Sequence, residues 1–136
     1  AEYDANLGHL VADMDAVHAE IEAALAPYRG RRFYVFHPAF GYFGDRYGLK
    51  QVAVETGGKE PSAKQIVSLI ERAKRDGVKV IFVQAQFPRR SAAAIAEAIG
   101  GAVIPMNPLA YDYLANIRDM AASLKSALAA KDAGND

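Results

Sequence analysis

From residue 32 onward, short segments rich in β-branched and aromatic residues alternate with amphipathic helical segments. The apolar runs predict four strands, at residues 32–36, 51–54, 78–83 and 102–104. Helical patterns follow each of them, at 39–47, from Pro61-Ser62 to Gly77, at 91–99 and at 114–128. Chains that alternate in this way form right-handed crossovers and a parallel sheet covered by helices on both faces. We therefore predict an α/β fold with a four-stranded, mainly parallel sheet.

A long amphipathic helix is predicted before the first strand, at residues 3–26. Pro27 and Gly30 end it. The mean helix has only about three turns, so this one is long for a small domain. It also starts without a clear cap, and we expect it to be the later part of a longer helix. One apolar stripe runs along it, formed by Leu7, Leu10, Val11, Met14, Val17, His18, Ile21 and Leu25.

Composition narrows the classes of function. The 136 residues are enough for one domain, and lysine plus arginine balance aspartate plus glutamate at 16 each. A neutral chain argues against a nucleic-acid binder. No apolar run reaches the length of a membrane span, and no signal-peptide pattern opens the sequence. The chain has no cysteine, so a metal site must use histidine, aspartate, glutamate or backbone oxygen.

The ends of the predicted strands carry the candidate chemistry. His37 follows the first strand and precedes Pro38, while Asp112 follows the fourth strand. Parallel strands end at one edge of a sheet, where open α/β folds bind their ligands. His37 and Asp112 can therefore approach each other, and imidazole with carboxylate suits Zn²⁺ or Mn²⁺. The alternative is structural: His37 as a capping or core histidine, and Asp112 as a favourable charge at the start of the last helix.

Other polar residues have simpler interpretations. His18 lies on the apolar stripe and is expected to be packed, and His9 points half a turn away, so the two cannot share a metal. Glu55 and Glu60 flank a glycine turn and are expected to be solvated loop carboxylates. The sequence contains no dinucleotide fingerprint, phosphate-binding loop or serine nucleophile elbow.

Five collinear motifs carry a family resemblance. They are HPAFGYF at 37–43, RYGL at 46–49, EPS at 60–62, VIFVQAQF at 80–87 and NPLA at 107–110. Together they resemble the C-terminal lobe of the periplasmic zinc- and manganese-binding receptors of ABC importers. That family also includes metal-binding lipoprotein adhesins. The resemblance covers essentially the whole chain.

The resemblance implies two α/β lobes joined by one long helix, with the metal between them. Residues 1–27 would be the interlobe helix and 28–136 the C-terminal lobe, with the N-terminal lobe absent. His37 falls on the first ligand of this lobe, and Asp112 falls on or next to its carboxylate ligand. Gln84, Asn107 and Glu60 would support the ligands. Gln84 and Asn107 stand where many members have glutamate and aspartate, respectively.

The implied function is capture of Zn²⁺, in preference to Mn²⁺, outside the cytoplasmic membrane and its delivery to an ABC permease, without catalysis. Two protein ligands make half of a tetrahedral site, so this chain alone should bind zinc weakly. Surface that faced the missing lobe should favour self-association. Two alternatives stay open: a metal-independent interaction or sensor domain of flavodoxin-like shape, and an enzyme in which Asp112 orients His37 as a general base.

Overall fold

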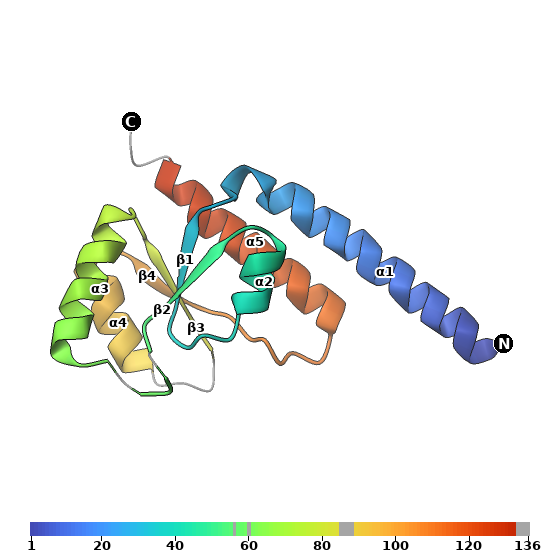
Figure 1. The fold of residues 1–136 in the computed structure, drawn as a ribbon, viewed down its shortest axis with the longest axis horizontal. Helices are drawn as coiled ribbons and strands as arrows, with labels where there is room; N and C mark the ends of the chain where they lie inside the picture. The colour runs from blue at the N-terminus through green and yellow to red at the C-terminus, as the bar shows by residue number, and fades with distance from the viewer. Residues whose placement is uncertain (56, 60, 85–88, 133–136) are drawn as a thin grey trace.

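The chain folds into a parallel sheet with helices on both faces, as the alternating pattern predicted (Figure 1). The computed structural model describes residues 1–55, 57–59, 61–84 and 89–132. The strands are β1(Arg32–Val35), β2(Lys50–Ala53), β3(Val80–Val83) and β4(Ala102–Pro105). The helices are α1(Glu2–Leu25), the short 3-10 helix η1(Ala26–Tyr28), α2(Gly41–Arg46), α3(Ala63–Arg75), α4(Arg89–Ala98) and α5(Tyr113–Asp132). Within these residues, no helix combines the length and apolarity needed to cross a membrane.

The strand order is β2-β1-β3-β4, and every neighbouring pair is parallel. The two inner strands are the most apolar, and their last three residues are buried. The chain steps from β1 outward to β2, then crosses back to β3 on the other side of β1. This reversal of winding lies between β1 and β3, and open α/β sheets form their ligand crevices at such a point.

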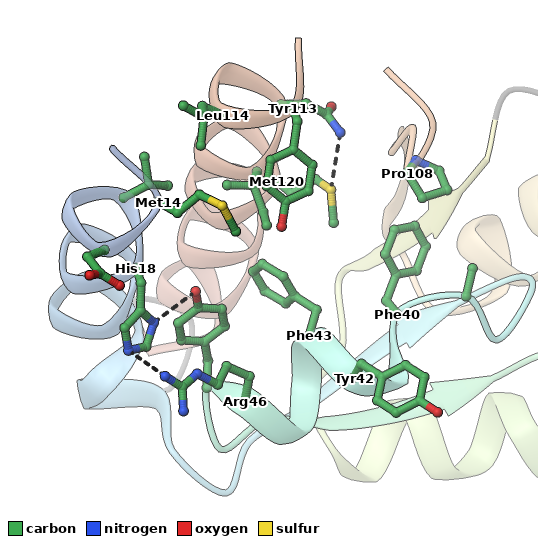
Figure 2. A pocket seen from close by; sticks show the side chains of 16 residues that line it. Met14, His18, Phe40, Tyr42, Phe43, Arg46, Pro108, Tyr113, Leu114 and Met120 are labelled. Atoms are coloured by element: carbon green, nitrogen blue, oxygen red, sulfur yellow. Dashed lines mark hydrogen bonds between the residues drawn. The ribbon is translucent and has the colours of Figure 1, made fainter. Parts of the chain in front are cut away.

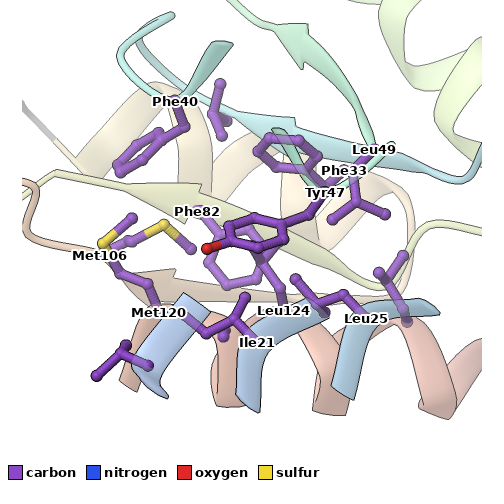
Figure 3. Close-up of a cluster of buried hydrophobic side chains, with 14 residues drawn as sticks. Ile21, Leu25, Phe33, Phe40, Tyr47, Leu49, Phe82, Met106, Met120 and Leu124 are labelled. Atoms are coloured by element: carbon purple, nitrogen blue, oxygen red, sulfur yellow. The ribbon is translucent and has the colours of Figure 1, made fainter. Parts of the chain in front are cut away.

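Two hydrophobic clusters fix the layers. On one face, Ile21 and Leu25 of α1 pack with Leu124 of α5 against Phe33 and Phe82 of the sheet (Figure 3). On the other face, α3 and α4 cover the sheet through Ala73, Ala92, Ile95 and Ala96, together with Ile99 just after α4. Each strand of the sheet's centre therefore contributes to both cores, as buried parallel strands do.

Helix α1 has the predicted length, but only its second half is packed. Val17, Ile21 and Leu25 are buried. The first half of the predicted stripe is exposed, and there the helix runs on beyond the body of the fold (Figure 1). Exposed positions of this half are Tyr3, Leu7, Leu10, Val11 and Met14.

Helix α2 is shorter than the predicted 39–47. After β1 the backbone bends, and the Ala39 N–H donates to the His37 carbonyl at 2.9 Å. The Phe40 N–H then donates to Gln51 Oε1 of β2 at 2.7 Å, and the helix starts at Gly41. A side chain of β2 thus sets the path of the loop that carries His37.

Candidate metal centre

His37 and Glu55 lie side by side at the carboxyl edge of the sheet. Strand register pairs Val35 of β1 with Ala53 of β2, so each side chain stands two residues beyond a matched pair. Backbone pairing continues past the strands, where the Glu55 N–H donates to the Phe36 carbonyl at 2.9 Å. His37 Nδ1 and Glu55 Oε2 are within hydrogen-bonding distance.

The burial of Glu55 corrects the sequence interpretation. Glu55 was expected to be a solvated loop carboxylate, yet its exposed fraction is only 9%. Glu55 follows the end of β2 by the same number of residues as His37 follows the end of β1. This equal spacing is the sequence signal that could have identified Glu55 as the partner of His37. Knowing the register, which the sequence did not reveal, was necessary to use that signal.

The contact determines what the imidazole can do. A histidine whose Nδ1–H donates to a carboxylate holds a fixed tautomer and orientation, with Nε2 as the atom that binds a metal. The His37 side chain keeps 34% of its surface exposed while Glu55 lies beneath it. A half-exposed imidazole on a buried carboxylate is thus suited to bind a cation approaching from outside the sheet edge.

Gln84 directly follows β3 at the same edge. It is buried, with 7% of its surface exposed, and β3 is the direct neighbour of β1. The backbone keeps these strand ends together, since the Phe36 N–H donates to the Phe82 carbonyl at 2.8 Å. Gln84 therefore lies on the crevice side of β1, where a supporting role was predicted. That role stays a prediction.

Asn107 and Asp112 shape the loop that leads from β4 into α5. Asn107 Oδ1 accepts from the Leu109 N–H at 3.0 Å, and the Asn107 carbonyl accepts from Asn116 Nδ2 at 2.8 Å. Asp112 Oδ1 accepts from the Ala115 N–H at 3.0 Å, which makes Asp112 the N-cap of α5. The structural alternative for Asp112 is therefore present, and its role as a ligand stays a prediction.

No group of three or more histidine, aspartate or glutamate side chains that could hold a metal occurs within the described parts of the chain. Glu60, a predicted supporting residue, lies outside the described residues. Among the described residues, the candidate centre therefore consists of the His37–Glu55 pair and the neighbouring residues at the same edge of the sheet.

His18 is part of a different arrangement, at the contact of α1 with α2 (Figure 2). Arg46 Nη2 donates to His18 Nε2 at 2.9 Å, and His18 Nδ1 lies 3.3 Å from Tyr47 Oη. With 29% of its side chain exposed, His18 is packed, as the stripe predicted. Beside it opens a pocket of about 450 Å³ between α1, α2 and α5.

The fold first defines a class: an open, doubly wound parallel sheet preceded by a long helix. The profile of the family described as "ZnuA: Zinc-uptake complex component A periplasmic" matches residues 1–127. The chain belongs to this family. Its members are solute-binding receptors rather than enzymes.

Individual relatives agree with the family. The high-affinity zinc uptake system protein ZnuA of Paracoccus denitrificans is 34% identical over 97 residues, which cover 70% of this chain and 30% of that protein. The protein of the same name from Brucella abortus is 28% identical over 137 residues, covering 94% of this chain and 41% of its own length. The chain thus spans less than half of these curated relatives.

Solved structures give the same picture. A crystal structure of ZnuA superposes with a TM-score of 0.90 at 36% identity, covering 93% of this chain and 49% of that one. A zinc-bound ZnuA deletion mutant superposes with a TM-score of 0.86 at 37% identity, covering 92% of this chain and 48% of the mutant chain. The laminin binding protein of Streptococcus agalactiae superposes with a TM-score of 0.75 at 28% identity, covering 84% of this chain and 47% of that one. It is described as an adhesin with metal-transporting activity.

Proposed function

We propose that this chain is the C-terminal lobe of an extracytoplasmic receptor that captures Zn²⁺ for an ABC importer. The observation that carries the proposal is the His37–Glu55 pair at the carboxyl edge of a sheet that matches solved ZnuA with a TM-score of 0.90. Zinc is cargo in this proposal, bound and released unchanged. No group-transfer step is assigned to the chain.

In this proposal His37 binds the ion through Nε2, because Glu55 engages Nδ1. Asp112 supplies a carboxylate oxygen. Its Oδ1 caps α5, but a carboxylate has a second oxygen, so capping and metal binding are compatible. Gln84, Asn107 and Glu60 would orient these ligands by hydrogen bonds.

Histidine favours zinc over manganese, whereas carboxylate-rich sites tolerate manganese. Zinc usually takes four ligands, so two from this lobe leave the rest to water. We expect affinity in the micromolar range or weaker, equivalent to about 8 kcal/mol or less. An intact receptor would add ligands from an N-terminal lobe and hold them in a closed, drier site.

The domain arrangement is part of the proposal. Residues 1–27 would be the helix that joins two lobes, and residues 28–136 would form this lobe. The exposed apolar first half of α1 supports this arrangement, since it offers surface for a second lobe to cover. An ABC permease would receive the ion from the intact receptor, and this lobe alone would self-associate through the uncovered surface.

Zinc titration tests the proposal. Chelator-treated protein is titrated against a chromophoric zinc competitor, together with His37→Ala, Asp112→Ala and the control His9→Ala, whose side chain is exposed on α1. We expect the first two variants to lose most zinc affinity and His9→Ala to retain it. Equal zinc affinity in the unaltered chain and all three variants would rule out the proposed site.

A metal-independent interaction domain is the second candidate. It is favoured by the fact that His37 and Asp112 both have protein partners without a metal, namely Glu55 and the Ala115 N–H. The two candidates differ in thermal unfolding: zinc should raise the melting temperature of a receptor lobe by binding only the native state, and should leave an interaction domain unchanged.

A further inference from the structure

The segment from His37 to Phe40 turns back along β2 and contacts the β2 chain at both of its ends. At the start of the segment, the His37 imidazole meets the Glu55 carboxylate just beyond β2. At its end, the Phe40 N–H donates to Gln51 Oε1 at 2.7 Å. Gln51 precedes Glu55 by four residues, which places the two about 13 Å apart along an extended chain. The proposed ligand is therefore carried by a segment that is held at two separate points.

Strand alternation directs both contacts to one face of the sheet. Gln51, Ala53 and Glu55 are alternate residues, so their side chains share a face. Ala53 packs against the hydrophobic cluster on the α1 and α5 side, in which Phe40 is buried (Figure 3). Val54 points the other way, into the cluster beneath α3 and α4. The face of the β2 chain that meets the His37–Phe40 segment thus has a polar side chain at each end.

Residues 38–40 have one backbone donor that reaches outside the segment. Pro38 has no N–H, and the Ala39 N–H donates to the His37 carbonyl at 2.9 Å, within the segment itself. The remaining donor is the N–H of Phe40, a residue only 3% exposed. A buried N–H without a partner is costly, and Gln51 supplies the acceptor. Gln51 therefore determines where the segment can end.

We propose that Gln51 is a positioning residue for His37. By fixing the far end of the segment, it keeps the imidazole against Glu55, in the orientation that binds the ion through Nε2. The inference rests on the proposed function for the ion, while the contacts themselves are properties of the chain without metal. The hydrogen bond uses the amide oxygen, and the Gln51 NH₂ group has no hydrogen bond among the described residues. The segment thus requires an acceptor here, which glutamate would keep and leucine would remove.

Nitrogen-15 NMR of the imidazole in metal-free protein, at mildly alkaline pH, tests the positioning. It distinguishes the Nδ1–H tautomer from the Nε2–H tautomer, and we expect His37 of the unaltered chain to be held as Nδ1–H. Gln51→Leu should give a mixture of tautomers and faster hydrogen exchange at the Phe40 N–H, whereas Gln51→Glu should preserve the Nδ1–H form. Lys50→Leu is the matched control, because Lys50 is the exposed neighbour of Gln51 in β2 and its side chain alternates to the other face.

Competitive zinc titration of the same variants gives the second readout. We expect Gln51→Leu to weaken zinc binding by about tenfold, the lower end of what orienting partners contribute. Gln51→Glu and Lys50→Leu should stay close to the unaltered chain. Circular dichroism melting checks that each variant is folded. Gln51→Asn, whose amide oxygen is one methylene short of the Phe40 N–H, provides the same test if Gln51→Leu does not fold.

An unchanged His37 tautomer in the folded Gln51→Leu variant overturns the inference. So does an unchanged zinc affinity of this variant when the unaltered chain binds zinc through His37. An equal effect of Lys50→Leu, or a failure of Gln51→Glu to preserve the two readouts, also overturns it. If the unaltered chain binds no zinc but the tautomer responds to Gln51→Leu alone, the positioning role is supported and the proposed zinc function is excluded.

Discussion

His37 Nδ1 faces Glu55 Oε2 because the parallel register of β1 and β2 carries both residues to the same level beyond the sheet. The carboxylate can therefore fix the ring before any metal arrives. Orienting partners of this kind are worth about 10- to 100-fold in metal affinity.

We expect Glu55→Gln to weaken zinc binding by roughly this 10- to 100-fold, since an amide oxygen carries no charge to increase the basicity of the imidazole. Competitive zinc titration measures the change. Glu71→Gln, at an exposed glutamate of α3, is the control and should bind like the unaltered chain. Unchanged affinity in Glu55→Gln would show that the contact does not serve the metal.

The capping role of Asp112 can be separated by mutation from its proposed role as a zinc ligand. Asparagine caps helices as well as aspartate does, whereas replacing the cap with alanine costs about 1 kcal/mol. We expect Asp112→Asn to keep the stability of α5 and lose zinc affinity, and Asp112→Ala to lose both. Urea unfolding and zinc titration on the same two variants separate the roles. If Asp112→Asn binds zinc normally, Asp112 is a cap and not a ligand.

The buried Tyr34 contacts the partly exposed Asp76 at the opposite edge of the sheet. The Tyr34 hydroxyl donates to Asp76 Oδ2 at 2.8 Å, and Arg32 donates to Asp76 Oδ1 at 2.9 Å. Burial, reinforced by the hydrogen bond to the carboxylate, raises the pKa of Tyr34 far above its ordinary value. The folded protein therefore keeps this proton at alkaline pH values where the unfolded chain releases it.

The sign of the pH dependence follows. Above the ordinary tyrosine pKa of about 10, the unfolded state binds fewer protons, so the free energy of unfolding falls as pH rises. Tyr34→Phe should cost about 1 kcal/mol at neutral pH and should make this alkaline decline shallower. Urea unfolding at neutral and alkaline pH measures both effects. An identical alkaline slope in the variant would contradict the assignment.

Two glycines give opposite predictions for the same substitution. A Cβ on Gly101 would lie 2.4 Å from the Lys79 carbonyl oxygen, so Gly101→Ala requires the backbone entry to β4 to shift. We expect destabilisation by about 1–3 kcal/mol. A Cβ on Gly8 of α1 would meet nothing within 4 Å. Gly8→Ala should therefore stabilise the helix by up to about 1 kcal/mol and raise its helical content.

Thermal unfolding and far-ultraviolet circular dichroism of the two alanine variants provide the measurement. Gly8 and Gly101 serve as controls for each other, because the chemical change is the same and only the surroundings differ. A Gly101→Ala protein as stable as the unaltered chain would mean that the close approach to Lys79 is not needed for the fold.

The strands were predictable because each is a compact apolar run, and each observed strand lies within two residues of its predicted bounds. The partner of His37 was not predictable, because strand order and register come from pairing between distant segments. Asp112 illustrates a second limit: an aspartate before a helix fits both a cap and a ligand. The stripe of α1 illustrates a third, since periodicity identifies the face but not how far the covering helix extends.

Among the described residues, helix α1 is anchored along its second half, where Val17, Ile21 and Leu25 are buried and Glu20 accepts two hydrogen bonds from Arg118 of α5, at 2.6 and 3.1 Å. A tilt of this anchored half would be amplified along the exposed first half of the helix, as along a lever. At 1.5 Å per residue it is about 20 Å long, so a tilt of about 10° at the anchored half moves the tip by about 3.5 Å. Small adjustments in the packing of α1 on α5 are thus amplified into displacements as large as an atomic contact at its far end.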